Sequence, residues 1–143
     1  MSSEQQRQQI PPDMKAFNSK LIDEFRANKG ELSGQMAGRQ LLLLTTKGAK
    51  SGTEHTVVIG YRPYKDNLAV IASNNGAPKP PAWFHNLQAN PVGTVEVGPD
   101  KYQVRMRVAE PDERSEAGKL IEYLEPQEAK AGHEIPVLIL ERV

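Results

Sequence analysis

Residues 41–56 read LLLLTTKGAKSGTEHT, an apolar run that leads into a turn and then into a second β-like segment. Four leucines followed by two threonines are typical of a buried strand. The glycines of the turn allow backbone N–H groups to converge, Ser51 adds a hydroxyl donor, and Lys50 adds a positive charge. The turn is therefore a candidate phosphate site, although the same residue types also form ordinary hairpin turns.

The composition limits the classes of protein to which the chain can belong. Its 143 residues are expected to form one domain with a core of its own. The absence of cysteine excludes disulfides, thiolate metal sites and cysteine nucleophiles. Lys+Arg and Asp+Glu both number 18, so the net charge of zero predicts no bulk attraction to nucleic acid. The apolar runs are too short for stable insertion into a membrane.

The N-terminal segment differs from the rest of the chain. Residues 1–12 are polar and lack the apolar core of a signal peptide, so we interpret them as a disordered leader. A single domain is expected over residues 13–143, and its expected localisation is the cytoplasm. The leader has one basic residue, Arg7, which argues against strong membrane attachment and leaves peripheral association open.

The hydrophobic pattern predicts about six strands and two or three helices. Helices are expected from the cap at Asp13 to the stop at Gly30, over residues 81–89, and from Pro111 with an inner face at Ala117, Leu120, Ile121 and Leu124. Strands are expected over residues 41–46, 55–61, 67–73, 93–97, 101–108 and 135–140. Because these strands mostly follow one another through short turns, the pattern favours an antiparallel sheet curled into a barrel. Residues 55–61 and 67–73 are expected to pair as a hairpin.

A second informative stretch, residues 72–91, reads ASNNGAPKPPAWFHNLQANP. It holds the one tryptophan of the chain, Trp83, beside a phenylalanine, a histidine and several amides. An aromatic wall with amide donors suits a flat polar ring such as a flavin. The alternative is that Trp83 packs in the core and that the asparagines cap turns.

Several other kinds of site are not supported. His55, His85 and His133 are scattered without the paired spacing of a metal site. The chain lacks the Gly-x-Ser-x-Gly elbow of a hydrolase and the glycine patterns of P-loop and dinucleotide-binding proteins. We assign no metal ligand and no catalytic acid, base or nucleophile.

In combination, LLLLTTKGAKSG at 41–52 and PAWFHNLQANP at 81–91 resemble the deazaflavin-dependent nitroreductase family. These are actinobacterial oxidoreductases that use coenzyme F420, and the match extends from Phe17 to Val137. The resemblance implies an α+β fold in which a split β-barrel, like that of FMN-binding proteins, carries flanking helices. It also implies transfer of a hydride from reduced F420 to an electron-poor small molecule: an activated C=C bond, a quinone or a nitroaromatic.

The resemblance also implies which residues bind the cofactor. Lys50 and Ser51 would hold the phosphate; His55, Thr56, Val57 and Val58 would line the cofactor channel; the backbone of Ala72, Ser73 and Asn74 would contact the deazaflavin ring; and Trp83 and Asn86 would line the ring pocket. The chain departs from the family where Ala49 and His55 replace usual arginines and where Gln127-Glu128 replaces a common Tyr-Gln pair. Fewer cations at the phosphate imply weaker binding.

Three alternatives stay open at this point. An FMN-dependent oxidoreductase could use the same barrel, a non-catalytic protein could carry F420, and an interaction domain could have the fold without any cofactor. The choice between monomer and dimer is open as well.

Overall fold

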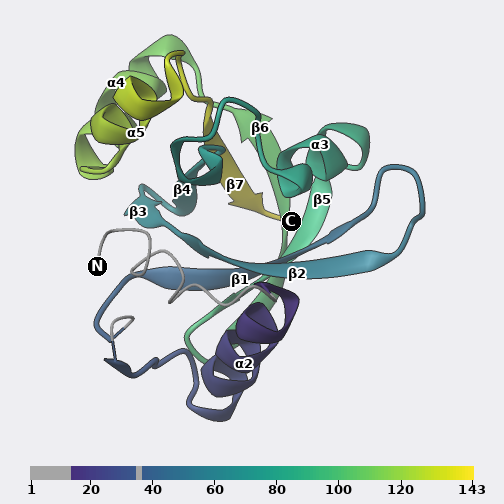
Figure 1. The fold of residues 1–143 in the computed structure, drawn as a ribbon. Coiled ribbons are helices and arrows are strands. Elements are labelled where there is room, and N and C mark those ends of the chain that lie inside the picture. The colour runs from purple at the N-terminus through teal and green to yellow at the C-terminus, as the bar shows by residue number, and fades with distance from the viewer. Residues whose placement is uncertain (1–13, 35–36) are drawn as a thin grey trace, which may run out of the picture.

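One antiparallel sheet forms the centre of the computed structural model, which describes residues 14–34 and 37–143 (Figure 1). Its seven strands lie in the order β2-β1-β5-β6-β7-β4-β3. The strands are β1 (Leu41–Lys47), β2 (Glu54–Gly60), β3 (Arg62–Tyr64), β4 (Asn67–Ile71), β5 (Val92–Val97), β6 (Asp100–Val108) and β7 (Val137–Arg142). The helices are α2 (Met14–Ala27), the 3-10 helix η2 (Asn74–Gly76), α3 (Ala82–Ala89), α4 (Pro111–Leu120) and α5 (Leu124–Ala131). The expected leader and the cap at Asp13 lie outside the described residues.

The sheet curls because its two edge strands are neighbours in the chain. β2 and β3 stand at opposite ends of the strand order, yet Tyr61 alone separates them. One residue spans at most about 3.5 Å, so the two ends of the sheet must come together. Tyr123 covers this seam: a methyl group at Gly60 would lie 2.9 Å from its hydroxyl oxygen. Glycine at position 60 therefore makes room for Tyr123 beside the junction of β2 and β3.

The hairpin expected between residues 55–61 and 67–73 is wrong. β2 pairs with β1, from Leu41 opposite Gly60 to Lys47 opposite Glu54, whereas β4 pairs with β7 and with the short strand β3. The sequence pattern missed β3 because three residues are too few to establish alternation, and Pro63 is unfavourable in a strand interior.

The helix expected from Pro111 through Leu124 is two helices. The backbone leaves the helical region at Ile121, with φ −98° and ψ 85°, and α5 begins at Leu124. Ala117, Ile121 and Leu124 are buried as expected, but Leu120 is 46 % exposed and does not belong to the inner face.

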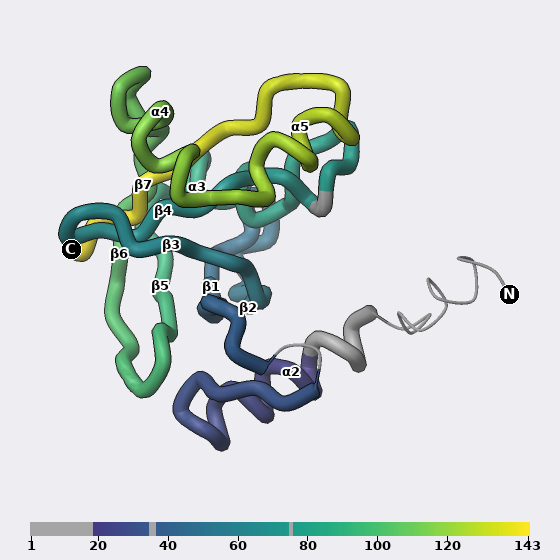
Figure 2. Tube along the Cα trace, turned by 90° about the vertical axis from the view of Figure 1, so that its left-hand side faces the viewer, coloured from purple at the N-terminus to yellow at the C-terminus, as the bar shows by residue number. Residues whose placement is uncertain are grey.

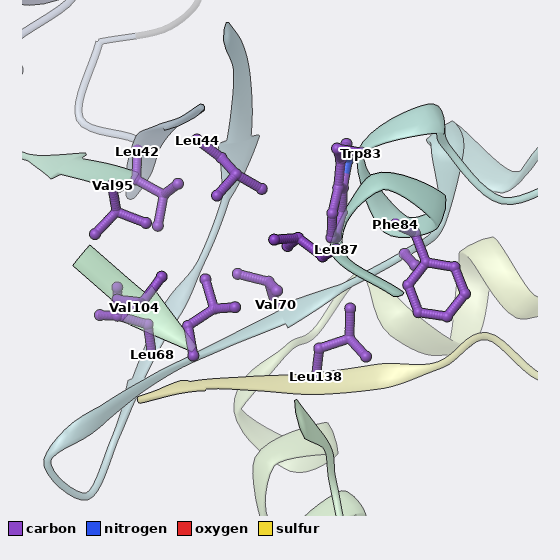
Figure 3. Packing of buried hydrophobic residues seen from close by; sticks show 12 residues of the cluster. Leu42, Leu44, Leu68, Val70, Trp83, Phe84, Leu87, Val95, Val104 and Leu138 are labelled. Carbon is purple, nitrogen blue, oxygen red and sulfur yellow. The ribbon is translucent and has the colours of Figure 1, made fainter. Parts of the chain in front are cut away.

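Two apolar clusters hold α3, α4 and α5 to the sheet. The first fills the barrel between α3 and the strands, and Figure 3 shows Leu87 pointing from α3 toward Leu44 and Val70, with Trp83 beside it. The second packs α4 and α5 against the outer side of β4 and β7, through residues such as Ile121 and Ile139. Figure 2 shows α2 at the opposite end of the molecule from α4 and α5. None of the described helices has the length and apolar composition needed to cross a bilayer.

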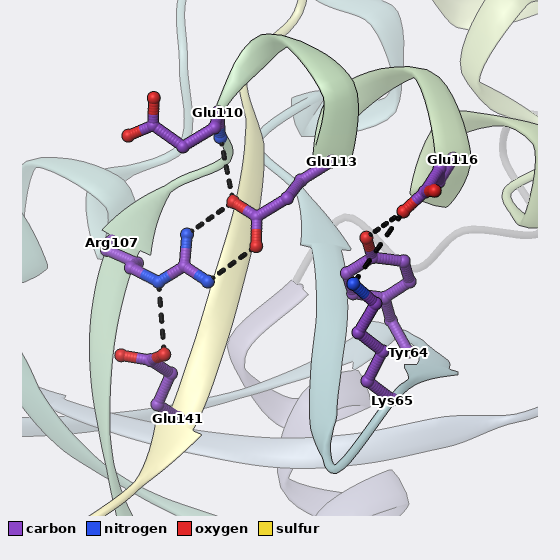
Figure 4. Close-up of polar contacts among 7 residues, drawn as sticks. All are labelled: Tyr64, Lys65, Arg107, Glu110, Glu113, Glu116 and Glu141. Carbon is purple, nitrogen blue, oxygen red and sulfur yellow. Dashed lines mark hydrogen bonds and ion pairs between the residues drawn. The ribbon is translucent and has the colours of Figure 1, made fainter.

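The N-terminus of α4 is held by an ionic network (Figure 4). Arg107 donates two hydrogen bonds to Glu113, at 2.5 and 2.7 Å, and its Nε lies 3.1 Å from a carboxylate oxygen of Glu141. The Glu113 carboxylate also accepts the backbone N–H of Glu110 at 2.9 Å, which completes a capping box. The hydrogen bonds from Arg107, and then that from Glu110, lower the pKa of Glu113 to about 2.

This shift predicts how stability depends on pH. The pKa of Glu113 is lower in the folded state than the value of about 4.3 expected in the unfolded chain. Its stabilising contribution is therefore complete above about pH 5 and is lost as the pH falls toward 2. We expect Glu113→Gln to lower the free energy of unfolding at neutral pH, and the difference from wild type to vanish near pH 2. Urea unfolding across this range measures it, and Glu31→Gln, at an exposed loop residue, is the control; a difference independent of pH would contradict the prediction.

Candidate functional site

The predicted phosphate turn is a defined loop between β1 and β2. The N–H of Gly48 donates to the carbonyl of Thr53 at 2.8 Å, and the N–H of Gly52 donates to the carbonyl of Gly48 at 2.9 Å. Gly52 has φ +71°, a conformation that favours glycine. Ser51 Oγ accepts the N–H of Thr53 at 3.1 Å, so its own hydroxyl proton remains available to a ligand. The glycines and the serine thus shape the turn as the sequence suggested.

Two consecutive N–H groups of this turn are available to an anion. Within the described residues, the N–H groups of Gly48, Ala49, Gly52 and Thr53 are bonded inside the protein, whereas those of Lys50 and Ser51 have no acceptor. Lys50 is exposed and takes part in no ion pair among the same residues. Successive free N–H groups beside a cation and a hydroxyl are a suitable arrangement for a phosphate.

The side chains of Ser51 and His55 both approach the backbone at Gly48. A methyl group at position 48 would lie 2.7 Å from Ser51 Oγ and 3.5 Å from His55 Nε2. The Thr53 carbonyl oxygen lies 3.4 Å from the same point, so these groups leave little room for a side chain at position 48. The Ser51 hydroxyl and the free N–H groups of Lys50 and Ser51 fit an anionic group, so the residues present are compatible with the phosphate of F420.

The four strand residues expected to line the channel divide between two faces of β2. Val57 packs against the barrel cluster, opposite Leu44 of that cluster. Thr56 and Val58 point to the other face because side chains alternate along a strand. Thr56 Oγ1 lies 2.7 Å from Thr45 Oγ1, and α2 packs on this side of β1 and β2 (Figure 1). His55 and Val57 therefore share one face, and Thr56 and Val58 share the opposite one.

The segment expected at the deazaflavin ring leads from β4 into η2. The N–H of Ala72 is already used, because it donates to the carbonyl of Pro136 at 3.1 Å. The carbonyls of Ser73 and Asn74 accept the N–H groups of Gly76 and Ala77 at 2.9 and 3.1 Å. Among the described residues the N–H groups of Ser73 and Asn74 have no acceptor. These two N–H groups are the donors that the segment can still offer to a ring.

The two α3 residues expected at the ring pocket have different surroundings. Trp83 is 6 % exposed and belongs to the barrel cluster, in an edge-to-face contact with Phe84 at 6.5 Å between ring centres. The Asn86 side chain points to the turn: its Oδ1 accepts the N–H of Ala49 at 3.1 Å, and its Nδ2 donates to Thr46 Oγ1 at 3.1 Å. Sequence reasoning missed Thr46, because nothing local indicates a partner 40 positions away.

Other parts of the surface offer less chemistry. One surface hollow lies beside α4 and α5, next to Ile121 and Glu125, and another lies between Phe84 and Pro111. No residue predicted for the cofactor lines either hollow. Within the described residues no group of three or more His, Asp or Glu side chains could hold a metal ion.

Comparison with known proteins identifies the family. The family model for F420H2-dependent quinone reductases matches residues 19–142. An F420H2-dependent quinone reductase of Mycobacterium tuberculosis is 28 % identical over 130 residues, which cover 82 % of this chain and 85 % of the relative.

Solved structures agree with this match. An F420H2-dependent reductase is 33 % identical, covers 72 % of this chain and 95 % of its own, and superimposes with a TM-score of 0.65. A protein solved as a domain-swapped dimer is 30 % identical, covers 92 % of this chain and 99 % of its own, and gives a TM-score of 0.68. A FAD-binding protein of Mesorhizobium loti, with 15 % identity, 86 % coverage of both chains and a TM-score of 0.51, shares the fold. The seven-stranded curled sheet is therefore a split β-barrel, and the chain belongs to the F420H2-dependent quinone reductase family.

Proposed function

We propose that this protein reduces a quinone-type acceptor with a hydride from reduced F420, and that the turn of residues 47–52 binds the phosphate of the cofactor. Membership of the family makes the chain an oxidoreductase and makes F420 its cofactor. When bound, reduced F420 supplies the hydride from C5 of its ring, and the quinone also takes up a proton to become a hydroquinone. Activated C=C bonds and nitroaromatics remain expected acceptors besides quinones.

The observation that carries the phosphate assignment is the pair of free N–H groups at Lys50 and Ser51. A phosphate accepts several hydrogen bonds at once, and here it would receive two backbone N–H groups, the Ser51 hydroxyl and the Lys50 ammonium. His55 Nε2, which approaches Gly48 beside the turn, can add one further contact. These contacts would hold the phosphate although Ala49 supplies no positive charge.

The deazaflavin ring would lie near Ser73 and Asn74, at the start of η2. The free N–H groups of Ser73 and Asn74 suit the carbonyl oxygens at the pyrimidine edge of a deazaflavin. Val57 and Trp83 belong to the apolar packing on the inner side of the barrel, which excludes water from that side. These residues would bind and orient the cofactor. We assign no proton donor among the described residues, so we propose that the proton comes from solvent.

Titration of the purified protein with F420 and with FMN tests the cofactor. We expect F420 fluorescence to change at micromolar protein, and we expect FMN to bind more weakly. Mixing the protein with reduced F420 and a benzoquinone should then regenerate oxidised F420 faster than the mixture without protein. Binding without oxidation would indicate the non-catalytic carrier, and tighter binding of FMN would contradict the assignment to F420.

Two further properties can be measured on the same sample. Because a 30 % identical relative was solved as a domain-swapped dimer, a dimer is the assembly to look for by light scattering. The cysteine-free sequence is compatible with a reducing compartment, and the cytoplasm remains the proposed location.

A further inference from the structure

Asn86 is a polar side chain enclosed between α3, β1 and the turn. It is 9 % exposed, and both ends of its amide are hydrogen-bonded. Oδ1 accepts the N–H of Ala49 and Nδ2 donates to Thr46 Oγ1, each at 3.1 Å. Thr46 itself is 3 % exposed. The amide therefore connects the last part of β1 to the middle of the turn.

The Asn86 amide is held in position by the packing of α3 against the core. Asn86 lies on α3 between Trp83 and Leu87, which are both buried in the barrel cluster. The burial of Trp83 and Leu87 restricts movement of α3 away from the turn. Because a buried amide that loses a partner is costly, the turn is held where Ala49 meets Oδ1.

The contact at Ala49 sets the direction of the groups that follow it. The next two residues are Lys50 and Ser51, whose N–H groups have no acceptor within the described residues. A backbone held at Ala49 and again at Gly52, by the bond to the carbonyl of Gly48, leaves little freedom for the two N–H groups between them. Asn86 thus orders an anion-binding turn without facing the anion.

We propose that Asn86 is a positioning residue for the cofactor phosphate, acting through Ala49, and that it is not part of the ring pocket. The proposal rests on the function proposed above. It assigns to α3 two separate tasks: Trp83 packs in the barrel, and Asn86 shapes the turn. Thr46 is the second positioning residue in this proposal, because its hydroxyl accepts a hydrogen bond from the Asn86 amide and fixes the orientation of that amide.

The proposal can be tested with two ligands that differ in the phosphate. One is F420, and the other is its phosphate-free fragment, which consists of the deazaflavin ring and the ribityl chain. We expect Asn86→Ala to raise the Kd for F420 about fivefold, the effect of losing one buried hydrogen bond, and to change the Kd for the fragment less than about twofold. A group that touched the ring would weaken both ligands equally, and that result would overturn the proposal.

A second variant keeps the test independent of the folding of Asn86→Ala. Thr46→Val preserves the shape of the side chain and removes the hydroxyl, so we expect it to raise the Kd for F420 about two- to threefold and to leave the fragment unchanged. In the double variant the two effects should not add, because both act through the same amide. Additive effects on the Kd for F420, or an equal loss of affinity for the two ligands, would contradict the proposal that Asn86 and Thr46 act together.

The control is Gln88→Ala on the exposed side of the same helix, which should change neither Kd. Circular dichroism and thermal unfolding verify that each variant is folded. If wild-type protein binds neither ligand, the proposed function and this inference both fail. If wild type binds F420 and Asn86→Ala binds it equally well, the inference alone fails.

Discussion

Lys50→Ala is expected to raise the Kd for F420 about 10- to 30-fold while leaving the fold intact. Lys50 is exposed and is free of ion pairs among the described residues, so its ammonium group can contact a phosphate at the adjacent N–H groups. A charge-assisted hydrogen bond contributes about 1.5–3 kcal/mol, which corresponds to about 10- to 150-fold in Kd. Because water and salt screen an exposed charge, we expect the lower part of this range.

The measurement is a fluorescence titration with F420 at two salt concentrations. Lys47→Ala is the matched control, because Lys47 is also exposed at the turn but lies opposite Glu54 in the strand register. It should have a smaller effect, and Lys50→Arg should retain most of the affinity. Unchanged binding by Lys50→Ala would place the phosphate elsewhere on the protein.

The second large effect is expected at Trp83, and it concerns stability. Trp83 is 6 % exposed and packs among the barrel residues shown in Figure 3. Truncation of a buried tryptophan leaves a cavity, so Trp83→Ala should lower the free energy of unfolding by about 3–5 kcal/mol. This loss is a large share of the total free energy of unfolding of a typical domain, which is about 5–15 kcal/mol.

Urea unfolding measures this loss. Trp83→Phe, which keeps an aromatic ring, should cost clearly less, whereas Gln88→Ala on the exposed side of α3 should change stability by less than about 0.5 kcal/mol. The Kd of the folded Trp83→Phe variant for F420 then tests the expected role of Trp83 in lining the pocket of the deazaflavin ring. If Trp83→Ala lost less than about 1 kcal/mol, the packing described for α3 would be contradicted.

Local patterns were enough to predict most of the individual elements. The leucine run became β1, the strand expected over residues 101–108 became β6, and Gly30, with φ +93°, lies just past the end of α2. Patterns failed where an element was too short or where its end depended on packing. β3 has three residues, and the break at Ile121 divides one expected helix into α4 and α5.

Pairing between elements was less predictable than the elements themselves. The turn residues Tyr-Lys-Asp-Asn at 64–67 lie between the strands expected at 55–61 and 67–73, yet the hairpin there is formed by β3 and β4, whereas β2 reaches back to β1. A turn signal shows that the chain reverses, but it does not show which strand lies on the other side. The free energy of burying both faces of the sheet decides that, and it depends on the whole chain.

In the candidate site, too, local features were predictable from the sequence and contacts between distant segments were not. The sequence was enough to recognise the family and its cofactor, because the motifs at 41–52 and 81–91 occur together in a specific order and separation. It also determined that a glycine-rich turn with Lys50 and Ser51 follows a buried strand. Tertiary structure alone decided that the amide of Asn86 meets the N–H of Ala49, 37 positions earlier in the chain. The physical reason is that backbone preferences act between neighbouring residues, whereas the partner of a buried polar group is chosen by how distant segments pack.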